Sequence, residues 1–348
     1  MIDPHVHLRD GKQQHKETLL HGLRVAEKIG LAAVFDMPNT APPILHRSDV
    51  LRRLSIARAA GSSVFYGLYC GLTSDSTQIT EAVECVREFQ QVVGLKLFAG
   101  KSTGNLSIPD TVSQRRVFQT LTEHDYRGVL AIHCEDEADF RPTDWDPQRP
   151  ITHTMVRPPI AEIHSITKMI KLARETRFKG TLHVCHISLS ESVEIIEAAR
   201  MDIAFQITCG ATPHHLLLWD TTMENADGLL LKMNPPLRSK SNQIALMQML
   251  LDGRIDWIET DHAPHLKKEK LEPPYASGIP GFPILPDLLR ILREKGASDS
   301  LISRITHDRV CEIFGLAIPN REIQDIDVFN EYEVNAYSDW IKKRKQTE

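Results

Sequence analysis

Eight short apolar runs recur along the chain, and this recurrence limits the possible folds more than any other sequence feature. They span residues 2–8, 31–37, 63–69, 92–98, 129–134, 181–187, 203–209 and 255–260. Most are followed by a segment with helical periodicity; after the first run, Leu19, Leu23 and Ala26 follow the i, i+4, i+7 rule. Further helices are predicted over 48–60, 76–90, 110–126, 160–178, 189–200, 239–252 and 282–295. This alternation predicts an α/β fold, a parallel (β/α)8 TIM barrel.

Residue types that bind metals fall at the ends of five of the eight predicted strands. They are His5 and His7, Lys96, His133, His186 and Asp261. The active site of such a barrel lies at the carboxyl ends of its strands, so these side chains should meet in one pocket. The pattern predicts a barrel of the metal-dependent hydrolase type.

The first run, IDPHVHLRD, places two histidines one residue apart. In a strand, residues i and i+2 share a face, so Asp3, His5 and His7 are expected to point to one side. Neutral imidazole is a common zinc ligand in proteins, and a divalent metal suits this set. Taken alone, the motif fits a solvated edge strand equally well.

Lys96 lies inside the apolar run GLKLF, where its side chain should point into the barrel mouth. Lysine is rarely buried without a partner, and burial lowers the pKa of its amine. The neutral amine can react with carbon dioxide, and the resulting carbamate could bridge two metals. The alternative is an ordinary ion pair, for example with Asp261; the histidines at neighbouring strand ends favour the carbamate.

His133 and His186 each end a predicted strand and could complete a second metal site, whereas His183 is interpreted as structural. Asp261, in TDHAPH, could ligate a metal and also exchange a proton with a bound hydroxide. Water on a metal, with a base beside it, suits the hydrolysis of an unreactive amide.

Four further polar residues are candidate substrate-binding groups. Arg9 could clamp a carboxylate with its guanidinium, although a surface salt bridge is an equal alternative. Asn39, Asn234 and His265 lie on loops that follow strands. The long loops 135–159 and 262–281 are expected to form a wall and a lid over the pocket.

The overall composition is that of an ordinary globular protein. The net charge is −5, so nothing indicates a nucleic-acid partner, and no long apolar run indicates a membrane. The six cysteines form no CxxC pair, as is typical of reduced thiols, and a cytoplasmic location is predicted. A homodimer is only a general expectation.

Eight motifs occur in an order that resembles the dihydroorotases of the amidohydrolase superfamily. They are DPHVHLRD, MPNT, GLKLFAGKSTGN, IHCED, HVCHIS, TPHHLLL, NPPLR and TDHAPH, and the resemblance covers roughly residues 1–315. It implies the reversible conversion of N-carbamoyl-L-aspartate to L-dihydroorotate in de novo pyrimidine biosynthesis.

The resemblance also implies a role for each site residue. His5 and His7 would bind one zinc and His133 and His186 a second, with carboxylated Lys96 and a hydroxide as bridges. Asp261 would ligate the first zinc and carry the proton. By the same resemblance, the remaining residues contact the substrate: Arg9, Asn39 and His265 would hold its carboxylate, and Asn234 would line the pocket.

The chain departs from many relatives at its ends. Only Met1 precedes the first predicted strand, so little or no accessory β-sandwich is expected, and either the form is barrel-only or the chain begins late. We expect a barrel over 1–315 and a C-terminal extension over 316–348 packed on it.

Two alternative functions stay open. A hydantoinase, dihydropyrimidinase or allantoinase would share the metal set, but Arg9 and Asn39 favour a substrate with a ring carboxylate. An inactive scaffold paralogue would be expected to lose metal ligands, and this sequence retains them all.

Overall fold

A computed structural model describes residues 1–101, 106–224, 227–338 and 340–341. Residues 102–105 of the GLKLFAGKSTGN motif, and residues 339 and 342–348 of the C-terminal extension, lie outside this description. Eight parallel strands are hydrogen-bonded in sequence order, β1 to β8, as the barrel prediction requires. The strands are β1 Ile2–Val6, β2 Ala33–Asp36, β3 Phe65–Gly71, β4 Val92–Phe98, β5 Val129–His133, β6 Thr181–Val184, β7 Gln206–Ala211 and β8 Trp257–Ile258.

The barrel is closed between its first strand and the residues that follow its last. Val6 pairs with His262 in a parallel bridge, and the backbone N–H of His7 donates to the carbonyl of His262 at 2.7 Å. Asp3 adds a side-chain link, since it accepts hydrogen bonds from Thr260 N at 3.0 Å and Thr260 Oγ1 at 2.5 Å.

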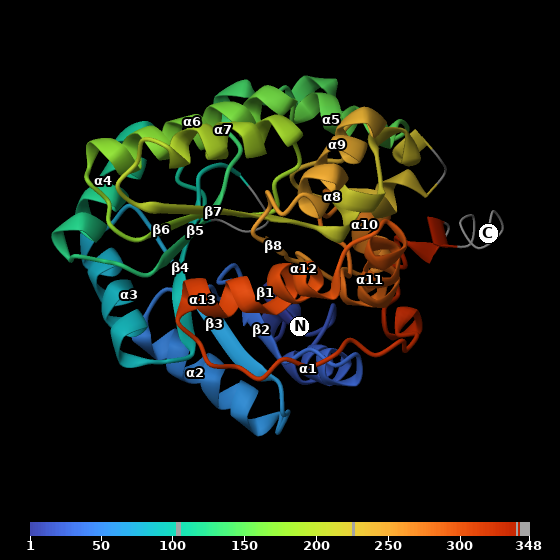
Figure 1. The fold of residues 1–348 in the computed structure, drawn as a ribbon, viewed down its shortest axis with the longest axis horizontal. Helices are drawn as coiled ribbons and strands as arrows, with labels where there is room; N and C mark the ends of the chain where they lie inside the picture. Colours follow the sequence, from blue (N-terminus) through green and yellow to red (C-terminus); the bar gives the residue numbers. More distant parts are fainter. Residues whose placement is uncertain (102–105, 225–226, 339, 342–348) are drawn as a thin grey trace.

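Helices surround the barrel (Figure 1). The main ones are α1 Leu19–Lys28, α2 Arg47–Ala59, α3 Ser76–Glu88, α4 Thr111–Glu123, α6 Pro159–Glu175, α7 Ser190–Arg200, α9 Lys240–Leu251 and α11 Leu285–Glu294. Shorter ones are α5 His153–Val156, α8 Pro213–Leu217, α10 Lys267–Leu271, α12 Asp299–Ser303 and α13 Arg309–Phe314. Several begin at a capping side chain, as Asp75 does for α3 and Asp110 for α4. Among the described residues, every helix is too short or too polar to span a lipid bilayer.

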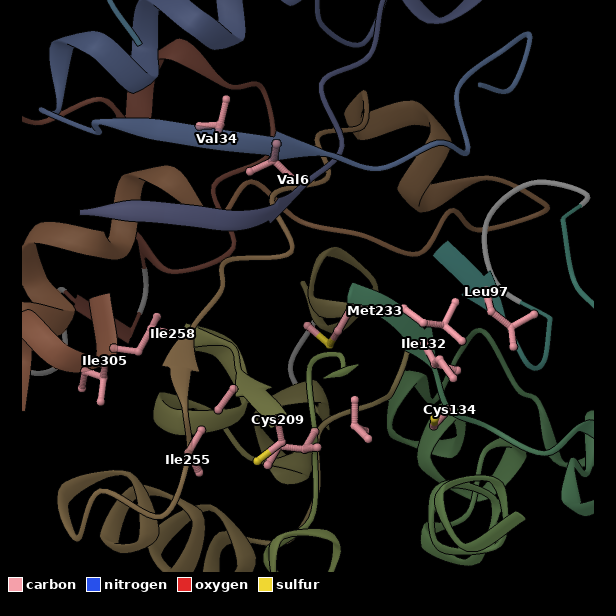
Figure 2. Close-up of a cluster of buried hydrophobic side chains, with 14 of the residues drawn as sticks. Val6, Val34, Leu97, Ile132, Cys134, Cys209, Met233, Ile255, Ile258 and Ile305 are labelled. Carbon is pink, nitrogen blue, oxygen red and sulfur yellow. The ribbon is translucent and has the colours of Figure 1, made fainter. Parts of the chain in front are cut away.

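Alternation along the strands divides the core into an outer and an inner layer. Leu97 and Ile132 are register partners on β4 and β5 and belong to the large apolar layer between strands and helices (Figure 2). Because neighbours in a strand face opposite ways, Lys96 and His133 point into the barrel. Toward the other end of the barrel, α13 contributes Phe314 to the inner apolar cluster.

Five strands end earlier than the sequence pattern predicts, and for β6 and β8 the structure shows what ends the strand. β6 stops at Val184 rather than at residue 187, because His186 takes a left-handed backbone conformation with φ 37°. β8 stops at Ile258 rather than at residue 260, since the N–H of Thr260 bonds to the carboxylate of Asp3 instead of to a strand. Both departures occur where side chains of the pocket are positioned.

The segment after α13 runs back along the barrel and contacts its first residues. The amino group of Met1 donates to Asn320 Oδ1 at 2.8 Å and to the carbonyl of Arg321 at 2.5 Å. Tyr332 and Tyr337 are buried farther along. All named strands of the described residues belong to the barrel.

Candidate active site

A pocket with an empty volume of about 380 Å³ lies at the carboxyl ends of the strands. It is lined by eight of the ten predicted site residues, namely His5, His7, Arg9, Asn39, His133, His186, Asn234 and Asp261. The other two lie behind its wall: Lys96 is fully buried on β4, and His265 contacts Arg9. Ala263, Ser277 and Gly278, from the predicted lid loop, also line it.

The first candidate ligand cluster joins β1 to the residues after β8. Asp261 Oδ1 lies 2.9 Å from His7 Nε2 and 3.4 Å from His5 Nε2. The other ring nitrogen of His7 lies 2.7 Å from Asn39 Oδ1, to which it can donate. Asp3 does not join this cluster, contrary to the expectation of a shared face, because its carboxylate is engaged by Thr260.

The second candidate cluster lies at the ends of β5 and β6. His133 Nδ1 and His186 Nε2 approach to 3.1 Å. The rings of His5 and His186 are 5.1 Å apart at their centroids, so the two clusters adjoin. His186 Nδ1 has no hydrogen-bond partner among the described residues although it is buried.

The donor set of both clusters fits divalent metal ions. Burial lowers the pKa of His7 to about 4 although Asp261 opposes this shift, and burial also lowers the pKa of His133 and His186. His7, His133 and His186 are therefore neutral at pH 7, the form that binds a metal. Burial and the nearby Lys96 lower the pKa of His5, but Cys185 and Glu259 outweigh them and raise it to about 9, so a metal ion would displace a proton from this ring. Burial raises the pKa of Asp261, but hydrogen bonding to His7 and the nearby His5 outweigh it, so its carboxylate is ionised and can be a ligand.

Lys96 lies on β4, next to β5, which carries His133 of the second cluster. Its Nζ donates to Cys185 Sγ at 3.0 Å and lies 5.0 Å from the centre of the Phe98 ring. The ion pair with Asp261 that was considered as an alternative is not formed, since Asp261 pairs with His5 and His7. Burial raises the pKa of Cys185, but the nearby Lys96, His5 and His183 outweigh this and lower it to about 5.

Two known proteins with similar sequences carry the same name. The chain is 33% identical over 319 residues to a dihydroorotase of Halobacterium salinarum, an alignment that covers 91% of this chain and 71% of the relative. It is 34% identical over 321 residues to a dihydroorotase of Thermococcus kodakarensis, covering 91% of this chain and 68% of the relative. The chain belongs to the dihydroorotase family. No family model matches it.

Solved structures place the fold of this dihydroorotase-family chain among related barrels. A dihydroorotase from Saccharomyces cerevisiae in complex with 5-fluoroorotic acid superposes with a TM-score of 0.72 at 19% identity, covering 91% of this chain and 84% of that one. An L-hydantoinase from Arthrobacter aurescens superposes with a TM-score of 0.78 at 23% identity, covering 90% and 70%. At these identities the superpositions support the fold, and they confirm the barrel prediction.

Arg9 is buried in this family member rather than placed in a surface salt bridge. Its Nη2 lies 3.2 Å from His265 Nε2, and its Nε donates to the carbonyl of Pro264 at 3.3 Å. Burial lowers the pKa of His265 to about 3, so this imidazole is neutral and has a single acceptor nitrogen. With its proton on Nδ1, which lies 3.5 Å from Glu269 Oε2, the ring can accept from the guanidinium at Nε2. Lys16 pairs with the other oxygen of Glu269 at 3.1 Å.

The loop 135–159, predicted to form a wall of the pocket, contacts a pocket residue through His153. His153, in the loop 135–159, lies with Nε2 3.0 Å from Asn234 Oδ1. His215, in the TPHHLLL motif, lies 2.8 Å from Thr212 Oγ1 and 3.1 Å from the carbonyl of Pro235. These contacts fit a support of the loop.

Two buried glutamates close to the ligands were not predicted. Glu135 Oε2 lies 3.0 Å from His133 Nε2 and accepts from Arg157. Glu259 lies beneath the first cluster, 3.5 Å from His5 Nδ1. The available signal was an acidic residue within or directly after an apolar strand, which is rare unless the carboxylate is paired.

Proposed function

We propose that this chain interconverts N-carbamoyl-L-aspartate and L-dihydroorotate, a step of de novo pyrimidine biosynthesis. The observation that carries the proposal is the buried Arg9 guanidinium lining the same pocket as the two candidate ligand clusters. A ring carboxylate supplies the partner that this buried cation needs, whereas hydantoin and dihydrouracil carry none. The dihydroorotases at 33% and 34% identity support the same activity.

Two divalent metal ions, zinc by the family resemblance, fit the clusters. His5, His7 and Asp261 would hold one, His133 and His186 the other, and Lys96, carboxylated at Nζ, would be shared by both. Such ions supply Lewis acidity toward an amide carbonyl and activate water at neutral pH.

Asp261 is the proposed proton carrier. Its pKa lies below the usual range, so it is ionised at neutral pH and can accept a proton. In ring opening, it would take the proton of the attacking water and donate it to the leaving ring nitrogen. Ring closure reverses the transfer.

The proposed substrate contacts follow from the pocket lining. Arg9 would bind the carboxylate with two parallel N–H donors, and His265 would hold the guanidinium in that orientation. Asn39 would contact the same carboxylate, and Asn234, fixed by His153, would line the opposite wall.

The wider proposal covers the whole chain. Residues 1–315 would form the catalytic barrel and residues 316–348 an extension packed on it. The protein would act in the cytoplasm. A homodimer is the general expectation for its oligomeric state. The only small-molecule partners proposed are the two substrates.

The decisive experiment is to assay ring opening of L-dihydroorotate, hydantoin and dihydrouracil by the purified protein, with metal content measured on the same sample. Turnover confined to L-dihydroorotate, with about two zinc ions per chain, is the expected result. Turnover of hydantoin or dihydrouracil instead would favour the alternative cyclic amidohydrolases. Bound metal without any turnover would favour an inactive scaffold.

A further inference from the structure

Glu259 is a fully buried carboxylate that contacts four groups from three parts of the barrel. Its Oε2 accepts hydrogen bonds from His183 Nε2 and Trp257 Nε1, both at 3.0 Å. Its Oε1 accepts from the backbone N–H of His186 and lies 3.5 Å from His5 Nδ1. One oxygen therefore contacts a candidate ligand of each cluster.

The surroundings of Glu259 hold its carboxylate in one orientation. Gly210 on β7 leaves the necessary space, because a Cβ there would lie 2.5 Å from Cδ and 2.6 Å from Oε2 of Glu259. His183 is fixed at its other ring nitrogen, 3.1 Å from Thr208 Oγ1, and its ring lies 4.3 Å from that of Trp257. A carboxylate held by this many partners cannot rotate without breaking several hydrogen bonds.

Each contact made by Oε1 controls one feature of a ligand. His186 has φ 37°, a left-handed conformation that is strained for a residue with a β-carbon and needs support from its surroundings. Its N–H is held by Glu259. At His5, Nδ1 lies 3.5 Å from Glu259 Oε1 and makes no hydrogen bond among the described residues, so the negative charge of Glu259 favours a proton there and leaves the lone pair on Nε2, which faces Asp261.

We propose that Glu259 is a positioning residue shared by both metal clusters. It selects the tautomer of His5 and maintains the backbone turn that directs the ring of His186 toward His133. This proposal rests on the metal sites of the proposed function. Loss of a carboxylate that orients metal-binding histidines typically weakens metal affinity 10- to 100-fold, and here the weakening should reach both ions.

The test is a titration of the metal-free protein with Co²⁺, followed by visible absorption, on the wild type and Glu259→Gln. We expect both dissociation constants to rise roughly 10- to 100-fold in the variant. In the metal-free protein, at a pH where the His5 ring is neutral, ¹⁵N spectra of His5 should show one tautomer in the wild type and a mixture in the variant.

Asp256→Asn is the matched control. Asp256 is also a mostly buried carboxylate just before β8, but it binds Arg200 at 2.5 Å, Arg309 at 3.0 Å and the N–H of Cys209 at 3.0 Å. The variant Asp256→Asn should leave the Co²⁺ affinity unchanged even if it lowers the free energy of unfolding.

Gly210→Ala is the second variant, because its methyl group would push the carboxylate of Glu259 aside without removing it. Gly210→Ala should raise the dissociation constants of both Co²⁺ ions as Glu259→Gln does. It tests the proposal even if Glu259→Gln does not fold. The shared role would be overturned if either folded variant bound Co²⁺ with wild-type affinity, or if the affinity fell at only one of the two sites. A wild type that binds no divalent metal would overturn the proposed metal sites themselves.

Discussion

At the scale of single residues, Arg9 offers the sharpest test of substrate recognition. Its guanidinium is buried and contacts His265 and a carbonyl, with no direct contact to His5, His7 or Asp261 within ion-pair or hydrogen-bond range among the described residues. Arg9→Gln should lower kcat/KM for L-dihydroorotate by roughly 30- to 700-fold, equivalent to about 2–4 kcal/mol, because one partner of a desolvated charge pair is lost. Metal content measured on the same sample should stay at the wild-type value. Loss of metal in this variant would contradict the substrate-clamp role.

Lys96 should behave in the opposite way. Lys96→Ala removes the proposed shared ligand from the interior of the barrel, so metal content and activity should fall together. The matched control is Lys28→Ala, an exposed lysine of α1 that pairs with Glu331 at 2.9 Å. Full metal content in Lys96→Ala would show that the amine is not a ligand.

Most candidate site residues could be predicted at this scale because they end apolar strands, and the barrel brings strand ends together. The partners of Asp3 and Glu259 could not. Asp3 bonds to Thr260, 257 residues away, and Glu259 reaches His183 and His5 across the barrel. Those contacts depend on strand register and side-chain rotation, which local sequence patterns do not encode.

At the scale of elements, the closure between β1 and the end of β8 should make stability depend on pH. Burial raises the pKa of Asp3 to about 7, despite hydrogen bonds from Thr260 that oppose the shift. Between about pH 4 and pH 7 the unfolded carboxyl is ionised while the folded one keeps its proton, so the free energy of unfolding falls as pH rises through this window. The whole effect is of the order of 4 kcal/mol for a shift of about three pKa units.

Asp3→Asn tests this dependence, because an amide does not titrate. The free energy of unfolding of the wild type and of Asp3→Asn is measured by chemical unfolding at pH 5 and pH 8. Relative to the wild type, Asp3→Asn should be more stable at pH 8 than at pH 5. A difference independent of pH would mean that Asp3 is ionised in the folded barrel throughout.

Helices and the middle of each strand were the elements best predicted from sequence. β4 spans 92–98 as expected, and α3 and α9 end within two residues of their predicted limits. β6 and β8 were predicted too long, because apolar composition continues past the residues where His186 turns and Thr260 bonds to Asp3. Apolar runs reveal burial, whereas the hydrogen bonds that end a strand come from other parts of the fold.

At the scale of the whole molecule, the segment after α13 should stabilise the barrel. Tyr337 is buried, and its hydroxyl has no hydrogen-bond partner among the described residues. Tyr337→Ala should therefore lower the free energy of unfolding by about 3–5 kcal/mol, as large aromatic truncations in a core do. Tyr337→Phe should change it by less than about 1 kcal/mol, since only an unpaired hydroxyl is removed. Equal effects of both substitutions in urea unfolding would show that the segment does not pack on the barrel in solution.

The charge distribution around the pocket leads to a prediction about salt. A cavity with an empty volume of about 1230 Å³ shares Asn234 and Ser277 with the catalytic pocket. Five cationic side chains line it, namely Lys16, Lys101, Arg157, Lys232 and Lys268, against two carboxylates, Glu269 and Glu272. Among the described residues, the ammonium of Lys232 donates to two neutral oxygens, the carbonyl of Tyr275 at 2.7 Å and Ser277 Oγ at 2.8 Å. Both proposed substrates are anions, so this cavity should concentrate them at low ionic strength.

The kcat/KM of the wild type should therefore fall as salt rises from about 0.01 M to about 0.15 M, over which the Debye length shortens from about 30 Å to about 8 Å. Lys268→Glu places a negative charge at the cavity, so it should lower kcat/KM at low salt and flatten the salt dependence. At a given salt concentration the loss must be the same in both directions, because the equilibrium constant fixes the ratio of the two kcat/KM values. Lys295→Glu makes the same charge change just after α11, at the opposite end of the barrel, and should leave the profile unchanged. Identical salt profiles for Lys268→Glu and the wild type would show that substrate capture depends on the buried charges of the pocket alone.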